Sequence, residues 1–351
     1  PENDGSGNPV PAQEAAAAKK LMLRIQRAKG LTKEFNETTL PRLRKLNWGT
    51  IGKSGETDQR TNLIFATQAT LLPHIYAKNP DIDVTPTEAV GQNEYKLMRQ
   101  FSKTARIFLN KMLVEEASLK PRCKSNVRSA MTTSVGWLKL STQFSISADD
   151  PLILRRVNDL QDNLRRIEYL IHSSKKETDT QKVLEKRQEL KEQLQTVMDG
   201  GEVKTFKGFV IDRIATEDVF ILDENVKEFD DYANAEALAH RVWMTDDEFN
   251  EQFSFLPPPG TTSYSQPSES TVGVAQPTSE GDASKGCFRA VYEVWNRKTG
   301  MVCCVCEGLK GYAKPPYKPQ FLSERFYTFF CLGFNGVEGR WRPLSDTELL
   351  E

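Results

Sequence analysis

Apolar residues recur in steps of three and four between residues 151 and 198, and this spacing constrains the fold more than any other feature of the sequence. The first run has steps of 4, 3, 4, 3 and 4 and consists of Ile153, Val157, Leu160, Leu164, Ile167 and Ile171. Such a seam is typical of a helix that packs along a partner helix. After the polar stretch HSSKKETDT the spacing resumes at Val183, Leu190, Leu194 and Val197, with Arg187 in one apolar position. Two helices joined by a short polar link predict an antiparallel coiled-coil hairpin over 151–198.

Helical patterns also dominate the chain before this hairpin. The expected helices are 15–29, 60–77, 93–119 and 121–134. Gly30 is a stop signal for the first of them. The third has a long apolar face, made of Tyr95, Met98, Phe101, Ala105, Phe108 and Met112. This spacing of three and four predicts a helix with a long, continuous apolar face.

The stretch HIYAKNPDIDVTP contains an abrupt change of pattern. Proline disfavours helical geometry in the residue before it, so Asn79-Pro80 ends the second helix. Ile82 and Val84 then alternate with two aspartates, which predicts a half-buried strand. We interpret the junction as a structural corner that turns a helix into a strand.

Strand patterns follow the hairpin. We expect strands at 137–144, which Gly136 opens, and at 203–215, 218–223, 236–244, 288–296, 301–309 and 325–334. The strands at 288–296 and 301–309 flank a turn and predict a β-hairpin. Thr245 with Glu248, and Ser345 with Glu348, have the spacing of capping boxes and predict helix starts. Helices and antiparallel strands in this order predict an α+β fold.

Composition divides the chain into four parts. Residues 1–12 are polar and predict a disordered N-terminus. Residues 13–255 form a mixed α+β domain that contains the helical hairpin. Residues 256–286 are rich in Pro, Ser, Thr and Gly and predict a flexible linker. Residues 287–351 form a small β-hairpin-rich region that leads into a helix at the end of the sequence.

Charge and hydropathy exclude several classes of protein. The chain has 351 residues and a net charge of −1, so it has no overall basic field for nonspecific DNA binding. No apolar run reaches the roughly 20 residues that a membrane span needs. The first residues do not have the pattern of a secretory signal. Six cysteines in a chain of this length, five of them after residue 286, indicate a reducing compartment rather than a disulfide framework.

The sequence offers little for catalysis. It has three histidines, His74, His172 and His240, without a His-x-x-x-His pair, and it has no Gly-rich phosphate loop. We therefore expect no enzyme activity and no cofactor, and we assign no catalytic, cofactor-binding or metal-binding residue. Residues that contact nucleic acid also stay unassigned.

One cysteine pair has the spacing of a zinc site. Cys303-x-x-Cys306 fits it, and Cys287, Cys304 and Cys331 could complete four thiolates. The pair lies within an apolar run that predicts a strand, where Cys303 and Cys306 would point to opposite faces. We therefore expect the cysteines to be metal-free strand residues.

Charged clusters have simple structural explanations. Asp81 and Asp83 share the solvent face of a predicted strand. Asp246, Asp247 and Glu248 occupy the first turn of a predicted helix, where they complement its dipole. The basic clusters are Arg42, Arg44 and Lys45, and Lys120, Arg122, Lys124 and Arg128. These could contact phosphate, but a solvated face is the simpler interpretation.

Several segments, in order between about residue 60 and residue 351, resemble the portal proteins of short-tailed phages. The matching positions are Tyr76, Ala77, Asn79, Pro80, Ile82, Val84 and Pro86; Gly136 and Trp137; Glu217, Asp218, Val219 and Asp223; the stretch HRVWMTDDEFNEQF at 240–253; Tyr292 to Asn296 with Lys298, Thr299 and Gly300; and RPLSDTELLE at 342–351.

This resemblance implies a structural subunit of the virion. Portal proteins form a ring, usually a homododecamer, at one capsid vertex among copies of the major capsid protein. Double-stranded DNA passes through the ring, the terminase motor docks on it during packaging in the host cytoplasm, and head–tail connector or tail proteins dock later. Residues 13–255 would be the wing, the hairpin 151–198 an insertion in it, and 287–351 the entry to a long stem helix. The sequence ends where that helix would start, so the resemblance implies a C-terminally incomplete chain. The residues themselves leave open whether the chain continues beyond Glu351.

Two other functions fit the residues without the resemblance. The coiled-coil hairpin could belong to a non-enzymatic adaptor protein. The cysteine cluster could belong to a zinc-bearing nucleic-acid-binding protein.

Overall fold

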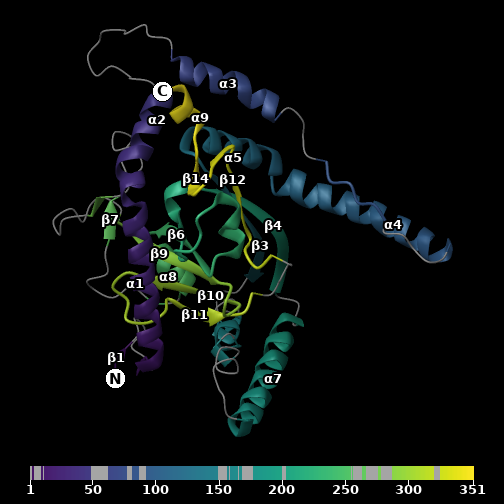
Figure 1. Ribbon diagram of the computed structural model, residues 1–351. Coiled ribbons are helices and arrows are strands. Elements are labelled where there is room, and N and C mark those ends of the chain that lie inside the picture. The colour runs from purple at the N-terminus through teal and green to yellow at the C-terminus, as the bar shows by residue number, and fades with distance from the viewer. Residues whose placement is uncertain are drawn as a thin grey trace.

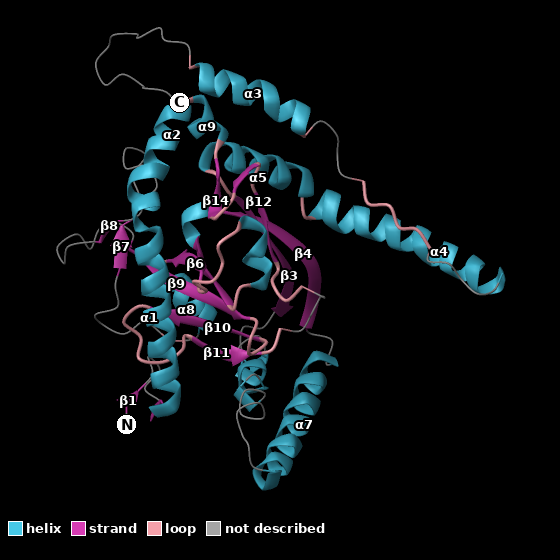
Figure 2. Cartoon of the chain, viewed as in Figure 1, coloured by secondary structure: helices cyan, strands magenta, loops and turns pink. Residues whose placement is uncertain are grey.

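Antiparallel sheets and long helices make up the part of the chain that the computed structural model describes (Figures 1 and 2). The described residues are 2–3, 9–10, 12–48, 62–76, 81–86, 92–148, 156–157, 159–164, 166–167, 177–199, 203–253, 255, 263–265, 276–277, 287–319 and 325–351. Within these residues the expected α+β class is confirmed.

The larger sheet contains strands from both sides of the expected linker. Its central order is β11 (Lys314–Tyr317), β10 (Met301–Cys306), β9 (Cys287–Asn296), β6 (Ala237–Met244) and β5 (Val219–Ile221), with antiparallel neighbours. The hairpin of β9 and β10 is confirmed, and Gly300 in its turn has a φ of 68°. Because β6 pairs along β9, the β-rich region after residue 286 does not stand apart from the domain before it.

Part of the expected linker is also strand. Ser263–Ser265 (β7) pairs with Cys287–Arg289 at the start of β9, and Gln276–Pro277 (β8) pairs with β7. Backbone pairing along an open strand edge does not need apolar side chains, so the polar composition did not reveal it. The remaining residues of 256–286 lie outside the described part of the chain. At the N-terminus, expected to be disordered, Glu2–Asn3 (β1) pairs with Pro9–Val10 (β2).

The second sheet has the order β12 (Phe329–Leu332), β3 (Gly136–Ala148) and β4 (Val203–Ile214). β3 and β4 pair over 12 successive residues and form a long ribbon. The ribbon begins at Gly136, where a Cβ atom would lie 2.3 Å from the backbone oxygen of Asn126. Glycine is therefore required for β3 to pass so close to helix α5 (Leu119–Thr133).

The predicted helical hairpin lies beyond the far end of this ribbon (Figure 1). Its second helix is α7 (Glu177–Asp199), and the described parts of its first half, at 156–157, 159–164 and 166–167, are also helical. Val157, Leu160 and Leu164 of the predicted seam are buried. Ile153, Ile171 and the start of the polar reversal lie outside the described residues.

The first helix is longer than the sequence predicts. α1 (Ala12–Glu34) buries Ile25 and Ala28, but it passes Gly30 and continues through the π-helical turn η1 (Phe35–Thr39) into α2 (Leu40–Trp48). The stop expected at Gly30 is therefore wrong. A glycine costs an exposed helix only about 1 kcal/mol.

Contacts on both sides of Gly30 outweigh that cost. Before it, Lys29 Nζ lies 2.5 Å from a carboxylate oxygen of Glu307. After it, Leu40 and Leu43 are buried, and the guanidinium of Arg342 stacks 3.8 Å from the ring centroid of Phe35. Figure 1 shows α1 running along the larger sheet, with α2 continuing it.

The core lies on both faces of the larger sheet. On one face, Ile25 and Ala28 of α1 pack with residues that include Phe220 and Tyr292. On the other, Trp137 and Phe329 of the second sheet pack with Trp295. Helix α8 (Asp246–Phe253) packs Phe249 and Phe253 over Cys304 and Cys306. The larger sheet is thus the middle layer of the fold.

The short helix starts follow their sequence signals. The Thr245–Glu248 capping box precedes α8, and the Ser345–Glu348 box precedes α9 (Asp346–Leu350), so both predictions are confirmed. Before α9, β13 (Asn335–Val337) and β14 (Arg340–Leu344) form a small hairpin. The 3-10 turn η3 (Thr216–Asp218) precedes β5, and the 3-10 turn η4 (Phe229–Asn234) lies between β5 and β6.

Helix α3 (Leu63–Ile75) is the described part of the helix expected at 60–77, and Asn79-Pro80 lies outside the described residues. Helix α4 (Gln92–Leu109) leads into the π-helical stretch η2 (Asn110–Glu116). The segment 81–86 is not paired in a sheet, so the strand expected there is wrong. The side chain of Asn110 instead bonds both backbone groups of Ile82, at 3.0 and 2.8 Å.

Candidate assembly surface

The two histidines that the structure describes, His74 and His240, lie on different elements. His74 is exposed on α3, His240 is half-buried on β6, and His172 lies outside the described residues. His240 Nδ1 lies 3.9 Å from a carboxylate oxygen of Glu293. The structure thus does not bring His74 and His240 together.

Glu293 is a partly buried carboxylate between the two sheets. Lys139 of β3 and the indole nitrogen of Trp295 both donate hydrogen bonds to it. Burial opposes ionisation, yet His240 and Lys139 hold the pKa of Glu293 well below its usual range. The charged Glu293 therefore connects β3 to β9. Because its carboxylate already accepts hydrogen bonds from Lys139 and Trp295, its contacts indicate a structural role rather than proton transfer.

The cysteines lie on a strand, as expected. Cys303 packs on the face of β10 that α1 covers, whereas Cys304 and Cys306 pack on the face that α8 covers. Burial raises the pKa of Cys303 far above its usual value and that of Cys306 to about 12. Cys331 lies in a third cluster, on β12. The opposite orientation of Cys303 and Cys306 is confirmed, and nothing is described of the Cys287 side chain.

The acidic clusters are bound to neighbouring groups of the chain. Asp81 and Asp83 are exposed and pair with Arg106, at 2.8 and 3.3 Å. Asp246 pairs with Arg289 across the start of α8, at 3.2 Å for one pair of atoms. Within the described ranges, no three His, Cys, Asp or Glu side chains are grouped so that they could hold a metal ion.

The two basic clusters differ in their surroundings. Arg44 pairs with Glu217 at 2.8 Å in a largely buried position, and Arg42 pairs with Glu351 at 3.1 Å. Lys45 is exposed. The basic residues of α5 are all exposed; they are Lys120, Arg122, Lys124 and Arg128. The first cluster thus serves the packing of α2, and the second is a solvated face.

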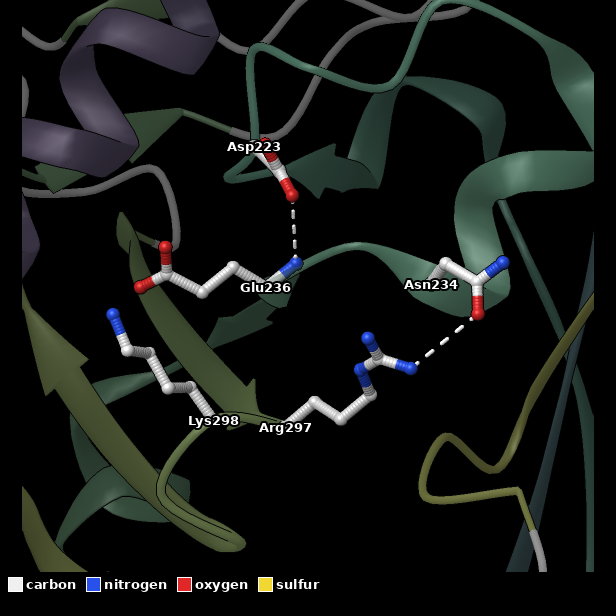
Figure 3. Close-up of a pocket in the computed structure, with 5 residues that line it drawn as sticks. All are labelled: Asp223, Asn234, Glu236, Arg297 and Lys298. Carbon is white, nitrogen blue, oxygen red and sulfur yellow. Dashed lines mark hydrogen bonds between the residues drawn. The ribbon is translucent and has the colours of Figure 1, made fainter.

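A surface hollow of about 540 Å³ lies beside the turn between β9 and β10 (Figure 3). Asp223 accepts hydrogen bonds from the backbone amides of Asn225 and Glu236, which lower its pKa. The carboxylate of Glu236 pairs with Arg24 at 2.9 Å. The acidic groups that line the hollow are therefore already used to close the connection from β5 to β6.

A buried polar cluster positions α3. The amide oxygen of Gln68 accepts a hydrogen bond from Asn47 at 2.7 Å, and its amide nitrogen donates to Thr347 at 2.9 Å. Asn47 also donates to Thr132 at 2.7 Å. These four side chains come from α3, α2, α9 and α5. They hold α3 across the other helices, with Gln68 and Leu72 as its buried residues.

The outward side of α3 is apolar and carries no charged residue. The sequence LIFATQATLLPHI contains no Asp, Glu, Lys or Arg. Four of its large apolar side chains are nonetheless exposed: Leu63, Phe65, Leu71 and Ile75. Leu63 is 72% exposed. A helix that is apolar around its circumference is normally buried, so α3 has the character of a covered element.

Helix α4 projects from the body of the molecule (Figure 1), and it also exposes large apolar side chains. Its exposed large side chains are Tyr95, Leu97, Met98, Phe101, Ile107 and Phe108. Phe101 is 72% exposed, and Ser102 is the one buried residue among the α4 side chains described. The apolar face predicted for this helix is therefore exposed within this chain.

Together, the exposed sides of α3 and α4 form what we call the assembly surface. Taking roughly 200 Å² for a large apolar side chain that is about half exposed, the four on α3 present roughly 400 Å² and the six on α4 roughly 600 Å². The largest apolar patch on a typical monomer measures about 300–600 Å² and is often functional. The sequence predicted the apolar face of α4 but not its exposure, because periodicity shows which residues share a face, not what covers it. The uncharged sequence of α3 was the signal that could have revealed the surface.

None of the helices in the described part of the chain combines the length and apolar character that crossing a membrane requires. The chain was also compared with known proteins: no protein-family model matches it, and no curated protein does.

Proposed function

We propose that the chain is a structural subunit of a tailed-phage portal, assembled as a homo-oligomeric ring at one capsid vertex. The observation that carries the proposal is the assembly surface of α3 and α4, which exposes large apolar side chains. An apolar surface of this size is expected to be covered by another protein. In a ring, every subunit covers the same surface of its neighbour.

The ordered sequence resemblance supports the same function. Gly136 belongs to it, and a Cβ atom there would collide with Asn126. Tyr292 to Asn296 and Lys298 to Gly300 belong to it as well, and they build β9 and its turn. The matching residues thus support packing and turns, as a structural subunit requires.

In this proposal the ring lets double-stranded DNA pass, and terminase, head–tail connector or tail proteins and the major capsid protein dock on it. The subunit has no catalysis of its own. The thiols of Cys303 and Cys306 are buried, which raises their pKa, and the acidic groups of the hollow already have partners. It would assemble in the host cytoplasm and act in the virion.

Native mass spectrometry and electron microscopy of the purified chain test this proposal. We expect closed rings, with mass at a fixed multiple of the 39.7 kDa subunit. A chain that stays monomeric across a wide range of concentration would contradict the ring and favour the adaptor. Zinc quantification is the second measurement. Stoichiometric zinc that is lost when Cys303, Cys304 and Cys306 are replaced by serine would favour the zinc-bearing protein.

A further inference from the structure

We infer that the apolar stripe of α4 in one copy docks on the exposed side of α3 in the next copy, so that each subunit of the ring uses both helices. The inference rests on the proposed ring and adds which surfaces meet. It starts from the fact that one chain has two exposed apolar helices in different places. α3 lies on the body, over α5 and α9, whereas α4 projects away from it (Figure 1).

The area that this contact covers is sufficient for a specific interface. Four large side chains are exposed on α3 and six on α4. At about 100 Å² each, pairing the two helices removes roughly 1,000 Å² from water. This value reaches the lower limit of about 1,000 Å² for a biological interface. A contact between two α3 helices, with four such side chains from each copy, would cover only about 800 Å² and would not reach it.

Charge argues against a contact between two α4 helices. Lys96, Arg99 and Lys103 are exposed on α4 and have no ion-pair partner among the described residues. Two α4 helices side by side would bring like charges together, which costs free energy. Helix α3 has no charged residue and can accept a basic amphipathic helix without this cost.

Symmetry favours the same pairing. A contact between two different surfaces of one chain is heterologous, and it closes into a ring when the rotation between copies allows it. A contact of α3 with α3, or of α4 with α4, would join two copies and leave the other helix exposed in both. The occupant of α3 is therefore a second copy of this chain, through its α4.

Cross-linking between two variants that each carry one added cysteine tests the pairing. Phe101→Cys labels α4 and Ala69→Cys labels the exposed side of α3; Gln188→Cys, exposed on α7, is the control. With a short bis-maleimide, we expect covalent dimers when the first two variants are mixed. We expect no increase over the wild-type chain for either variant alone, or for the control mixed with either.

A second measurement does not depend on the cross-linker. Phe101→Asp should weaken assembly at least 30-fold, the change that corresponds to about 2 kcal/mol for a central contact residue. Leu184→Asp on α7 is the control, since Leu184 is 43% exposed, close to the 42% of Met98 in the stripe. It should leave assembly unchanged. Because all these side chains are exposed, the variants should keep the wild-type circular dichroism spectrum.

The outcomes separate this inference from the proposed function. The pairing is overturned, and the ring is kept, if two results occur together. Phe101→Asp would form rings with the same midpoint concentration of assembly as the wild type, and the mixed sample of the two cysteine variants would give no cross-links. Cross-links in the Phe101→Cys sample alone overturn it in favour of a contact between α4 helices. A wild-type chain that is monomeric and binds anionic phosphatidylserine vesicles overturns both, because the basic amphipathic α4 would then be a membrane-surface helix.

Discussion

Replacing Gln68 by methionine should loosen the connection between α3 and the rest of the molecule. Gln68 is 6% exposed and bonds Asn47 and Thr347, at 2.7 and 2.9 Å. Methionine has a similar length and volume, so the cavity cost is small. The hydrogen bonds of the Gln68 side-chain amide are lost. The buried hydroxyl of Thr347 then no longer accepts a hydrogen bond from residue 68.

The expected cost follows from these bonds. Each buried polar partner left unsatisfied costs about 1–3 kcal/mol. Asn47 keeps its bond to Thr132, so its loss lies near the lower end of that range. We therefore expect Gln68→Met to lower the free energy of unfolding by about 2–4 kcal/mol.

Urea denaturation, followed by circular dichroism, measures this loss. Gln100→Met on exposed α4 is the matched control and should stay within about 0.5 kcal/mol of the wild type. Thr347→Val completes a double-mutant cycle, and we expect a coupling energy of about 0.5–3 kcal/mol with Gln68→Met. A cost below about 1 kcal/mol together with no coupling would refute the view that this cluster holds α3 to α9.

Three further perturbations test other parts of the fold. Leu164→Pro should destabilise the first hairpin helix by about 3 kcal/mol or more, through a lost hydrogen bond and a ring clash; unchanged helicity and protease resistance would contradict the hairpin. Ile82→Asp should cost about 1–3 kcal/mol of stability and impair assembly. The double variant Asp81→Asn with Asp83→Asn should have little effect, since the ion pairs of both aspartates are exposed. The opposite pattern would identify a functional surface. The pKa of Glu293 is lowered in the folded protein, so its contribution to stability is present above the unfolded value of about 4.3 and is lost as pH falls further. Glu293→Gln should thus reduce stability at neutral pH and flatten its loss in acid, as measured by thermal unfolding across pH; an unchanged acid limb would contradict the charged pair.

Local patterns in the sequence predicted much of the secondary structure. The capping boxes at Thr245 and Ser345 mark helix starts in the structure because each box is completed by residues three apart. The β9–β10 hairpin was predictable for the same reason, since its turn lies between adjacent strands. The buried seam residue Leu164 follows from a spacing that one helix imposes on itself.

The departures came from contacts between distant residues. Helix α1 continues past Gly30 because Leu40, Leu43 and the stacked Arg342 stabilise the turns beyond it. Residues 81–86 stay unpaired because Asn110 takes the backbone groups of Ile82 that a neighbouring strand would have used. Neither partner can be identified from local spacing.

The exposure of α3 and α4 was decided only by the tertiary structure. The sequence by itself determined that α4 has an apolar face and that α3 has no charged residue. Burial depends on which surfaces meet, and that depends on the path of the whole chain. In this fold the interior faces of the larger sheet are already filled by α1, α8 and the second sheet, so the apolar side of α4 has no place to pack within its own subunit.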